Sequence, residues 1–346
     1  MKVKITLFFL LLSFYFNAQN GGKSSFPLLN FNYSARLAGI GGYSNSTRDL
    51  DASQGILNPS LINSNMVGQY SINQGLLASG INFGQLATVI PLKKGFLLPS
   101  IRYINYGEFK GTDEVGNPTT NFSAFEYVVG AGYGYQLNPL FSIGINLNVI
   151  GSHLETYSSF GLSSNFGASF TNTNKLFSVT ILAKNIGYQL KSYVSSSRRP
   201  LPIDIQASTS LKLKHAPFRF SIIAHHLNQW NISYFDPSIK PSFDALTGET
   251  IDNTGAGFGE ILARHLAYQV ELITQGMMQL RLGFDYNRRQ ELKLEQRPGM
   301  SGFSLGLGLK FKKFALDYGF NIYSKAGFAN SVGISAKLAD WKKNKQ

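Results

Sequence analysis

The chain has 346 residues, contains no cysteine and carries a formal net charge of +13. Disulfide bonds are therefore excluded. A helical membrane protein is excluded as well, because it needs apolar runs of about 18 residues or more and the one candidate run, Ile5 to Phe16, is shorter. Stability must then come from a large core or from a closed, hydrogen-bonded barrel.

Residues 1–18 have the pattern of a secretory signal peptide. Lys2 and Lys4 precede the apolar run and Ala18 follows it, which is the order that such leaders show. We therefore expect export, which argues against a nucleic-acid partner for this basic chain. In an outer membrane the positive charge would meet anionic lipopolysaccharide or a partner surface, and loops that are simply solvated are the alternative.

Residues 19–64, called the plug segment below, lack sustained alternation and are rich in small and polar residues. We expect this segment to fold into the lumen of a barrel, where glycine allows close backbone approach and charged side chains pair with the wall. An ordinary periplasmic extension is the alternative. The candidate pairing residues are Arg36, Arg48, Asp49, Asp51 and Asn58, and the wall partners expected for Arg48, Asp49 or Asp51 are Arg281, Asp285 or Asp317.

Residues 65–338 contain about fourteen segments in which every second residue is apolar. In Phe303 to Phe311, for example, the intervening residues are Ser, Gly, Gly and Lys. Period two is typical of strands, and a polar face rich in glycine favours a transmembrane antiparallel β-barrel over a soluble sandwich. The predicted strands are Val67–Gly75, Ile81–Pro91, Phe96–Tyr106, Phe122–Leu137, Leu140–His153, Phe160–Thr171, Leu176–Ile186, Ile203–Lys214, Phe218–Leu227, Leu262–Thr274, Met278–Arg288, Gly302–Phe311, Phe314–Tyr323 and Phe328–Leu338.

Short turns and longer connections alternate between these strands. Outer-membrane barrels have short periplasmic turns and long external loops, so the pattern predicts a short-turn end and a long-connection end, with both chain termini at the short-turn end. The longest connection runs from Asn228 to Ile261, and residues 339–346 form a basic tail.

No catalytic motif stands out in the sequence. His225 and His226 with the nearby Ser221 are the one arrangement worth weighing, but adjacent strand residues point to opposite faces. We expect neither catalysis nor a cofactor. Forked guanidinium groups suit phosphate and carboxylate, so the basic loop residues are candidates for lipopolysaccharide or partner contact, with solvated charge as the alternative: Arg198, Arg199, Lys240, Arg288 and Arg289.

An ordered set of short stretches resembles the PorV/PorQ family of barrels of the type IX secretion system. The resemblance runs over nearly the whole mature chain. The stretches are Gly22–Asn30, Ser34–Arg36, Asn58–Ser60, Asp244–Glu249, Arg264–Leu266, Arg288–Leu292 and Pro298–Ser304.

The resemblance implies a fourteen-stranded outer-membrane barrel similar to the FadL fatty-acid transporters, with an N-terminal segment in the lumen. It also implies a non-catalytic role as the membrane anchor of a cell-surface attachment complex with PorU, PorV and PorZ, which processes exported cargo and joins it to lipopolysaccharide. One departure is the C-terminus, where Leu338 is followed by a basic tail rather than a terminal aromatic residue. The alternative function is a FadL-like channel for hydrophobic small molecules, against which a lumen fully packed by Arg36 to Leu61 would argue.

Overall fold

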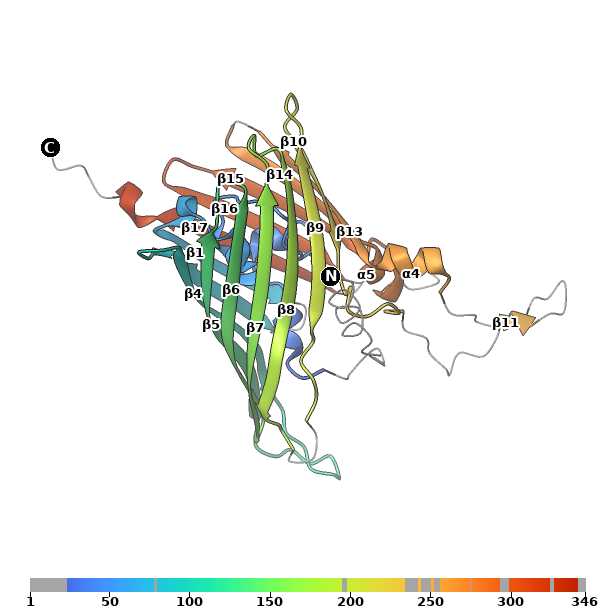
Figure 1. Ribbon diagram of the computed structural model, residues 1–346. Helices are drawn as coiled ribbons and strands as arrows, with labels where there is room; N and C mark the ends of the chain where they lie inside the picture. The colour runs from blue at the N-terminus through green and yellow to red at the C-terminus, as the bar shows by residue number, and fades with distance from the viewer. Residues whose placement is uncertain are drawn as a thin grey trace, which may run out of the picture.

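The wall of the molecule is one antiparallel sheet closed into a barrel (Figure 1). The computed structural model describes residues 24–77, 80–194, 198–233, 242–243, 250–251, 256–274, 276–292, 299–323 and 327–341. The strands are β1 (Gln69–Leu77), β2 (Asn82–Thr88), β3 (Ile90–Pro91), β4 (Phe96–Phe109), β5 (Phe122–Gln136), β6 (Phe141–Leu154), β7 (Tyr157–Thr171), β8 (Phe177–Lys191), β9 (Asp204–Lys212), β10 (Phe218–Ala224), β13 (Leu266–Ile273), β14 (Met278–Asp285), β15 (Phe303–Lys310), β16 (Phe314–Ile322) and β17 (Phe328–Lys337), with a separate pair β11 (Ser242–Phe243) and β12 (Thr250–Ile251).

Each wall strand pairs with its neighbours in the chain, and β1 pairs with β17 from Gln69 opposite Lys337 to Leu77 opposite Ala329. Both β2 and β3 pair with β4, so they form one wall strand interrupted at Val89. The described part of the chain thus has fourteen wall strands. The predicted transmembrane antiparallel β-barrel is confirmed.

Two predicted strands are wrong at the long-connection end. Helix α4 (Phe258–Arg264) occupies the start of the segment predicted as Leu262–Thr274, and helix α5 (Tyr286–Leu292) occupies the end of the segment predicted as Met278–Arg288. In α4, Glu260 and Arg264 form an ion pair one turn apart at 2.8 Å, which supports a helix. The Asp285 carboxylate accepts a hydrogen bond from the Arg288 backbone N–H at 3.0 Å, as an N-terminal cap does.

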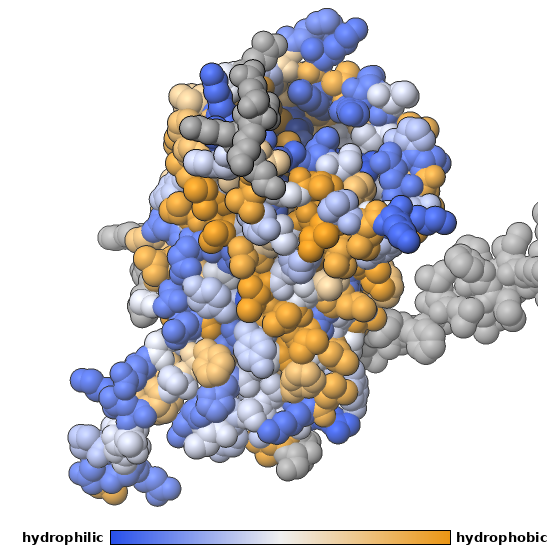
Figure 2. All heavy atoms as spheres, turned by 90° about the vertical axis from the view of Figure 1, so that its left-hand side faces the viewer, coloured by the Kyte–Doolittle hydropathy of each residue, from blue (hydrophilic) through white to orange (hydrophobic). Residues whose placement is uncertain are grey.

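Large apolar side chains cover the outside of the wall. Leu147 on β6 and Ile181 on β8 are 60% and 61% exposed, whereas Asn146 beside Leu147 is buried in the lumen. On the face shown in Figure 2, apolar side chains are spread widely and hydrophilic ones gather at the upper and lower ends. This is the arrangement that hydrocarbon contact requires. No helix among the described residues is both long and apolar enough to cross a membrane.

The described part of the plug segment lies inside the barrel. It comprises short helical turns: η1 (Pro27–Asn30), α2 (Ala35–Ala38), α3 (Ala52–Leu57), η2 (Pro59–Leu61) and η3 (Ser64–Met66). The Ser25 backbone N–H donates to the Pro200 carbonyl at 2.9 Å, in the long connection between β8 and β9. The chain then runs through the lumen to the short-turn end, where β1 begins. The described residues thus begin at the long-connection end, and the N-terminus itself, which was expected at the short-turn end, lies outside the described residues.

Wall glycines let the plug backbone lie directly against the strands. A Cβ on Gly144 of β6 would lie 2.3 Å from the Pro59 carbonyl carbon, and one on Gly306 of β15 would lie 2.8 Å from the Gly39 Cα. Real Cβ contacts are not this short. The glycine-rich face seen in the sequence is thus the face that receives the plug.

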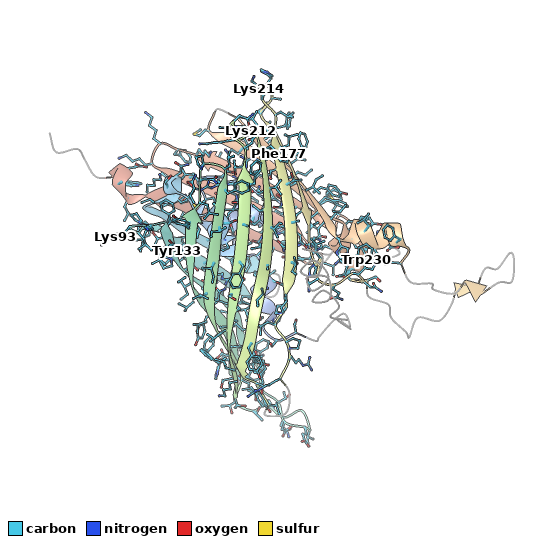
Figure 3. The ribbon with its side chains drawn as sticks, in the orientation of Figure 1. Lys93, Tyr133, Phe177, Lys212, Lys214 and Trp230 are labelled. Atoms are coloured by element: carbon cyan, nitrogen blue, oxygen red, sulfur yellow. The ribbon has the colours of Figure 1, made fainter. Side chains whose placement is uncertain are left out.

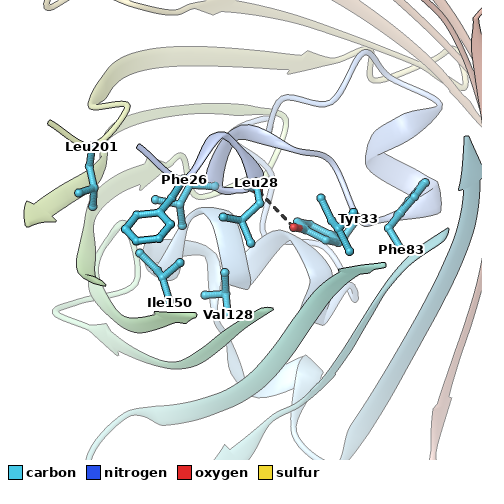
Figure 4. Close-up of a cluster of buried hydrophobic side chains, with 9 residues drawn as sticks. Phe26, Leu28, Tyr33, Phe83, Val128, Ile150 and Leu201 are labelled. Carbon is cyan, nitrogen blue, oxygen red and sulfur yellow. Dashed lines mark hydrogen bonds between the residues drawn. The ribbon is translucent and has the colours of Figure 1, made fainter. Parts of the chain in front are cut away.

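An apolar cluster fills the half of the lumen nearer the long connections (Figure 4). The expectation of a polar lumen is wrong in this half, because plug side chains bury apolar surface against inward-facing wall residues. The Tyr33 hydroxyl within it donates to the Leu28 carbonyl at 3.2 Å. The cluster consists of Phe26, Leu28, Leu29, Tyr33, Phe83, Ile104, Val128, Ile150 and Leu201.

Candidate functional site

A network of buried ion pairs joins the plug to the wall near the short-turn end. Arg36 of the plug pairs with Asp49 and lies 3.2 Å from Glu271 of β13. Arg219 of β10 contacts Asp49 at 2.6 Å and Glu271 at 2.8 Å. Two plug residues therefore bind the wall directly, Arg36 through Glu271 and Asp49 through Arg219.

The network continues along the wall to residues that the sequence analysis named. Arg281 of β14 lies 3.6 Å from Glu271 and 2.5 Å from Asp317 of β16. Both residues reach the plug through Glu271 and Arg36. Asp285, at the end of β14, is not part of this network. It accepts a hydrogen bond from the hydroxyl of Tyr43, a plug residue, at 3.1 Å.

The partners Arg219 and Glu271 were missed by the sequence analysis. Each is a charged residue between apolar neighbours in an alternating segment: Phe218 and Phe220 flank Arg219, and Val270 and Leu272 flank Glu271. A charge at a lumen-facing position is the signal that could have found them, because an inward charge in a filled barrel needs a counterion.

The other predicted plug residues have different roles. Asp51 lies 3.6 Å from Arg36 and caps α3 by accepting from the Ser53 N–H at 2.9 Å. Asn58 accepts hydrogen bonds from the Ser60 N–H and hydroxyl, at 3.2 and 2.6 Å, and so holds a turn within the plug. The Arg48 guanidinium makes one long hydrogen bond, 3.4 Å, to the Gln136 side chain of β5.

Burial and ion pairing oppose each other at the plug carboxylates. Burial alone would raise the pKa of Asp49, but the guanidinium groups of Arg219 and Arg36 outweigh it and hold that pKa well below its ordinary value. At Asp51 burial prevails over Arg36, and the pKa is raised. Asp49 is therefore the anionic centre of this network, and its ion pairs fix the position of the plug against the wall.

The basic residues assigned to external loops are mostly engaged by the protein itself. Arg198 donates to the Tyr188 hydroxyl at 2.6 Å and lies over its ring, and Arg289 donates to the Gly299 carbonyl at 2.6 Å. The Arg288 guanidinium donates to the Gly41 carbonyl at 3.1 Å, which attaches the plug to α5. The Arg199 N–H donates to Gln189 at 3.1 Å. Lys240 lies outside the described residues.

A pocket of about 520 Å³ opens between the start of the plug and the long-connection ends of the wall strands. Its volume is in the range of small-molecule sites. Phe26 belongs both to this pocket and to the apolar cluster beneath it. The Tyr106 hydroxyl donates to Glu126 at 2.7 Å at its edge. The other lining residues are Ser24, Ser25, Pro27, Phe109, Ala124, Leu154, Gln189, Tyr193, Val194 and Arg199.

The histidines weighed in the sequence analysis do not meet the serine. The Ser221 hydroxyl is hydrogen-bonded to Ser210 at 2.7 Å, whereas the His225 ring stacks on Tyr43 with centroids 4.6 Å apart. Burial lowers the pKa of His225 to about 4. Among the described residues, no group of three or more His, Asp or Glu side chains could hold one metal ion.

Several solved structures are similar to this chain in fold. The CymD monoaromatic hydrocarbon channel matches with a TM-score of 0.53 at 12% identity, over 90% of this chain and 99% of that chain. The toluene transporter TodX of Pseudomonas putida matches with 0.51 at 11%, over 88% and 96%. A Pseudomonas aeruginosa FadL homologue matches with 0.50 at 10%, over 92% and 100%.

No protein-family profile and no curated protein sequence matches the chain. At these identities the solved structures show the fold alone. The chain is accordingly a transmembrane β-barrel with a FadL-like fold.

Proposed function

We propose that this barrel takes up hydrophobic small molecules and binds them first in the pocket at the long-connection end. The observation that carries the proposal is the apolar lining of that pocket, supplied by Phe26, Phe109, Leu154 and Val194. Apolar walls with a few polar groups are typical of sites for such ligands. Two solved structures of the same fold are, by their titles, a hydrocarbon channel and a toluene transporter, which supports the same class of substrate.

The packed plug determines how such a molecule would proceed. Residues 35–62 contact the wall at glycines on β5, β6, β7, β14, β15, β16 and β17, so a molecule that crosses the lumen has to pass the plug. An occupant of the pocket would instead touch Phe26, near the start of the described part of the plug. Release of substrate therefore requires a rearrangement of the plug.

Binding of radiolabelled laurate and toluene to the full-length barrel in nanodiscs, with empty nanodiscs subtracted, tests the proposal. Ala124 lines the pocket and is 7% exposed, so Ala124→Trp should fill it and weaken binding about tenfold. Ala207→Trp on β9 serves as a control outside the pocket. Absence of saturable binding, or equal loss in both variants, would contradict the proposal.

A second candidate function is the non-catalytic anchor of the type IX attachment complex. The specific observation in its favour is the plug packed against the wall glycines inside the lumen, which suits a partner-binding barrel better than an open channel. The family resemblance supports it, with PorU, PorV and PorZ as the expected partners and lipopolysaccharide as a further contact.

Deletion of residues 238–255 from the longest connection tests this second candidate. The deletion should release the partner from the cell surface while the barrel stays folded, and co-purification from outer membranes identifies what is lost. A shorter deletion, of residues 112–119 in the β4–β5 connection, serves as the control. Unchanged retention of every surface protein, together with laurate or toluene binding, would favour the uptake function.

A further inference from the structure

A second pocket, of about 370 Å³, lies at the opposite, short-turn mouth of the lumen. Its lining is mainly polar, in contrast to the apolar pocket at the other end. Four of its residues carry positive charge: Arg48, Lys175, Lys212 and Arg219. Hydroxyl and amide groups make up most of the rest: Thr47, Asn63, Ser64, Asn65, Gln136, Thr171, Asn172, Thr173, Ser178 and Ser210.

The positive charge of this pocket is not neutralised by the protein. In the described part of the chain, Arg48, Lys175 and Lys212 form no ion pair with a carboxylate. The one carboxylate in the lining is Asp49, and it is already bound by Arg36 and Arg219. The neighbouring pocket adds Lys310, whose strand ends at the same mouth.

A charge count over this half of the lumen gives the same result. Among the described residues that line the two short-turn pockets or join their ion-pair network, seven cations face four carboxylates, an excess of three positive charges. The cations are Arg36, Arg48, Lys175, Lys212, Arg219, Arg281 and Lys310, and the carboxylates are Asp49, Asp51, Glu271 and Asp317.

Two polar atoms in this lining are buried without a partner. Arg48 Nε and Thr171 Oγ1 have no hydrogen bond within the described residues. The one hydrogen bond of the Arg48 guanidinium, to Gln136, is long at 3.4 Å. Buried donors normally find an acceptor, so an anion in the pocket would satisfy groups that the protein leaves unpaired.

We propose that the short-turn pocket binds a small organic anion that carries a phosphate group. A planar guanidinium beside two ammonium groups matches the charge and oxygen geometry of a phosphate, and the hydroxyl and amide groups supply further hydrogen bonds. The pocket is large enough for an ester as well as its phosphate. A phospholipid headgroup and a soluble phosphate ester share this chemistry.

Lys214 provides the matched control for Lys212, and Figure 3 shows both residues at the same end of the barrel. Lys212 and Lys214 both lie at the short-turn end near β9 and β10, but Lys212 lines the pocket and Lys214 does not. A general attraction of anions to the basic end would depend on both residues. A specific site in this pocket depends on Lys212 and not on Lys214.

Calorimetric titration of the full-length barrel in a non-ionic detergent with glycerol 1-phosphate, and with glycerol as the uncharged comparison, tests the site. We expect saturable binding of the phosphate ester alone. Arg48→Gln and Lys212→Gln should each weaken it about tenfold, Arg48→Lys should weaken it less because the charge remains, and Lys214→Gln should leave it unchanged. Heat-modifiable migration on gels checks that each variant is folded.

A second arm separates the two sources of phosphate. Barrels from nanodiscs containing phosphatidylglycerol or phosphatidylcholine are analysed for retained lipid by native mass spectrometry. Retention of phosphatidylglycerol that is lost in Arg48→Gln, without binding of glycerol 1-phosphate, assigns the pocket to a headgroup. Binding of neither probe, binding of an acidic peptide alone, or equal loss in Lys214→Gln and Lys212→Gln would overturn the proposal.

Discussion

Asp49 holds two arginines from different parts of the molecule, Arg36 of the plug and Arg219 of the wall. Removing its charge leaves both guanidinium groups buried with fewer counterions, a change that costs about 3–5 kcal/mol when one partner of a buried pair is lost. Asp49→Asn should therefore lower the thermal stability of the barrel and expose the plug to protease. Glu114→Gln, in an exposed loop, is the control and should behave as wild type in both assays.

His225 makes stability depend on pH. Burial lowers its pKa to about 4 in the folded barrel, below the value of about 6.5 for an unfolded histidine, so the unfolded chain binds the proton more tightly. The contribution of His225 to stability is then fully present above pH 6.5 and is lost as the pH falls from about 6.5 to about 4. His225→Gln should reduce the change in melting temperature with pH over this window, and a variant at the exposed His215 should not.

At the scale of single residues, the sequence identified the plug charges but not their partners. The expectation that Arg48, Asp49 and Asp51 pair with charges in the lumen rested on a segment of small and polar residues without strand alternation. Arg219 and Glu271 could not be paired from the sequence, because their contact depends on which strands lie opposite the plug. The register of a barrel is set by every strand between them.

At the scale of elements, Gly144 of β6 is the position where a side chain would collide most directly with the η2 turn of the plug. Gly144→Ala places its Cβ 2.3 Å from the Pro59 carbonyl carbon, so the plug must shift or detach. We expect a loss of about 1–3 kcal/mol from overpacking, measured by thermal unfolding. Gly259→Ala is the control, because its Cβ meets nothing within 4 Å and alanine favours helix α4.

The strand pattern was predictable because lipid on one side and the lumen on the other impose strict alternation. Most predicted wall strands begin and end within a few residues of the observed ones. Helices α4 and α5 escaped prediction because each has only seven residues and directly adjoins a wall strand, β13 or β14. The burial of Val128 and Ile150 inside the lumen was also not predicted. Both pack against apolar residues of the plug, and strand periodicity does not reveal that contact.

At the scale of the whole molecule, the outside of the wall faces hydrocarbon. Leu147 lies in the middle of β6 and is 60% exposed, and Val115, in the β4–β5 connection, is 86% exposed. Leu147→Lys should destabilise the inserted barrel by about 2–4 kcal/mol, measured by urea unfolding from liposomes. Val115→Lys should have no effect, since its side chain is in water. Equal destabilisation by the two substitutions would contradict the contact of Leu147 with hydrocarbon.

The overall charge was predictable from the sequence, but its location was not. Loop arginines were expected to present positive charge to the exterior, and the structure instead uses Arg288 to hold the plug. Cations without an ion-pair partner among the described residues lie at the short-turn mouth. Two of them are the last residues of their strands, Lys212 of β9 and Lys310 of β15. Only the closed barrel brings these residues to one opening.

The course of the N-terminal segment also constrains the order of assembly. It passes lengthwise through the cylinder, from the contact of Ser25 with Pro200 to the start of β1 at Gln69, and the seam between β1 and β17 completes the ring. A segment in this position cannot enter a closed barrel through the wall. Residues 25–68 must therefore enter through an open end of the barrel or be enclosed by the wall before the β1–β17 pairing closes it.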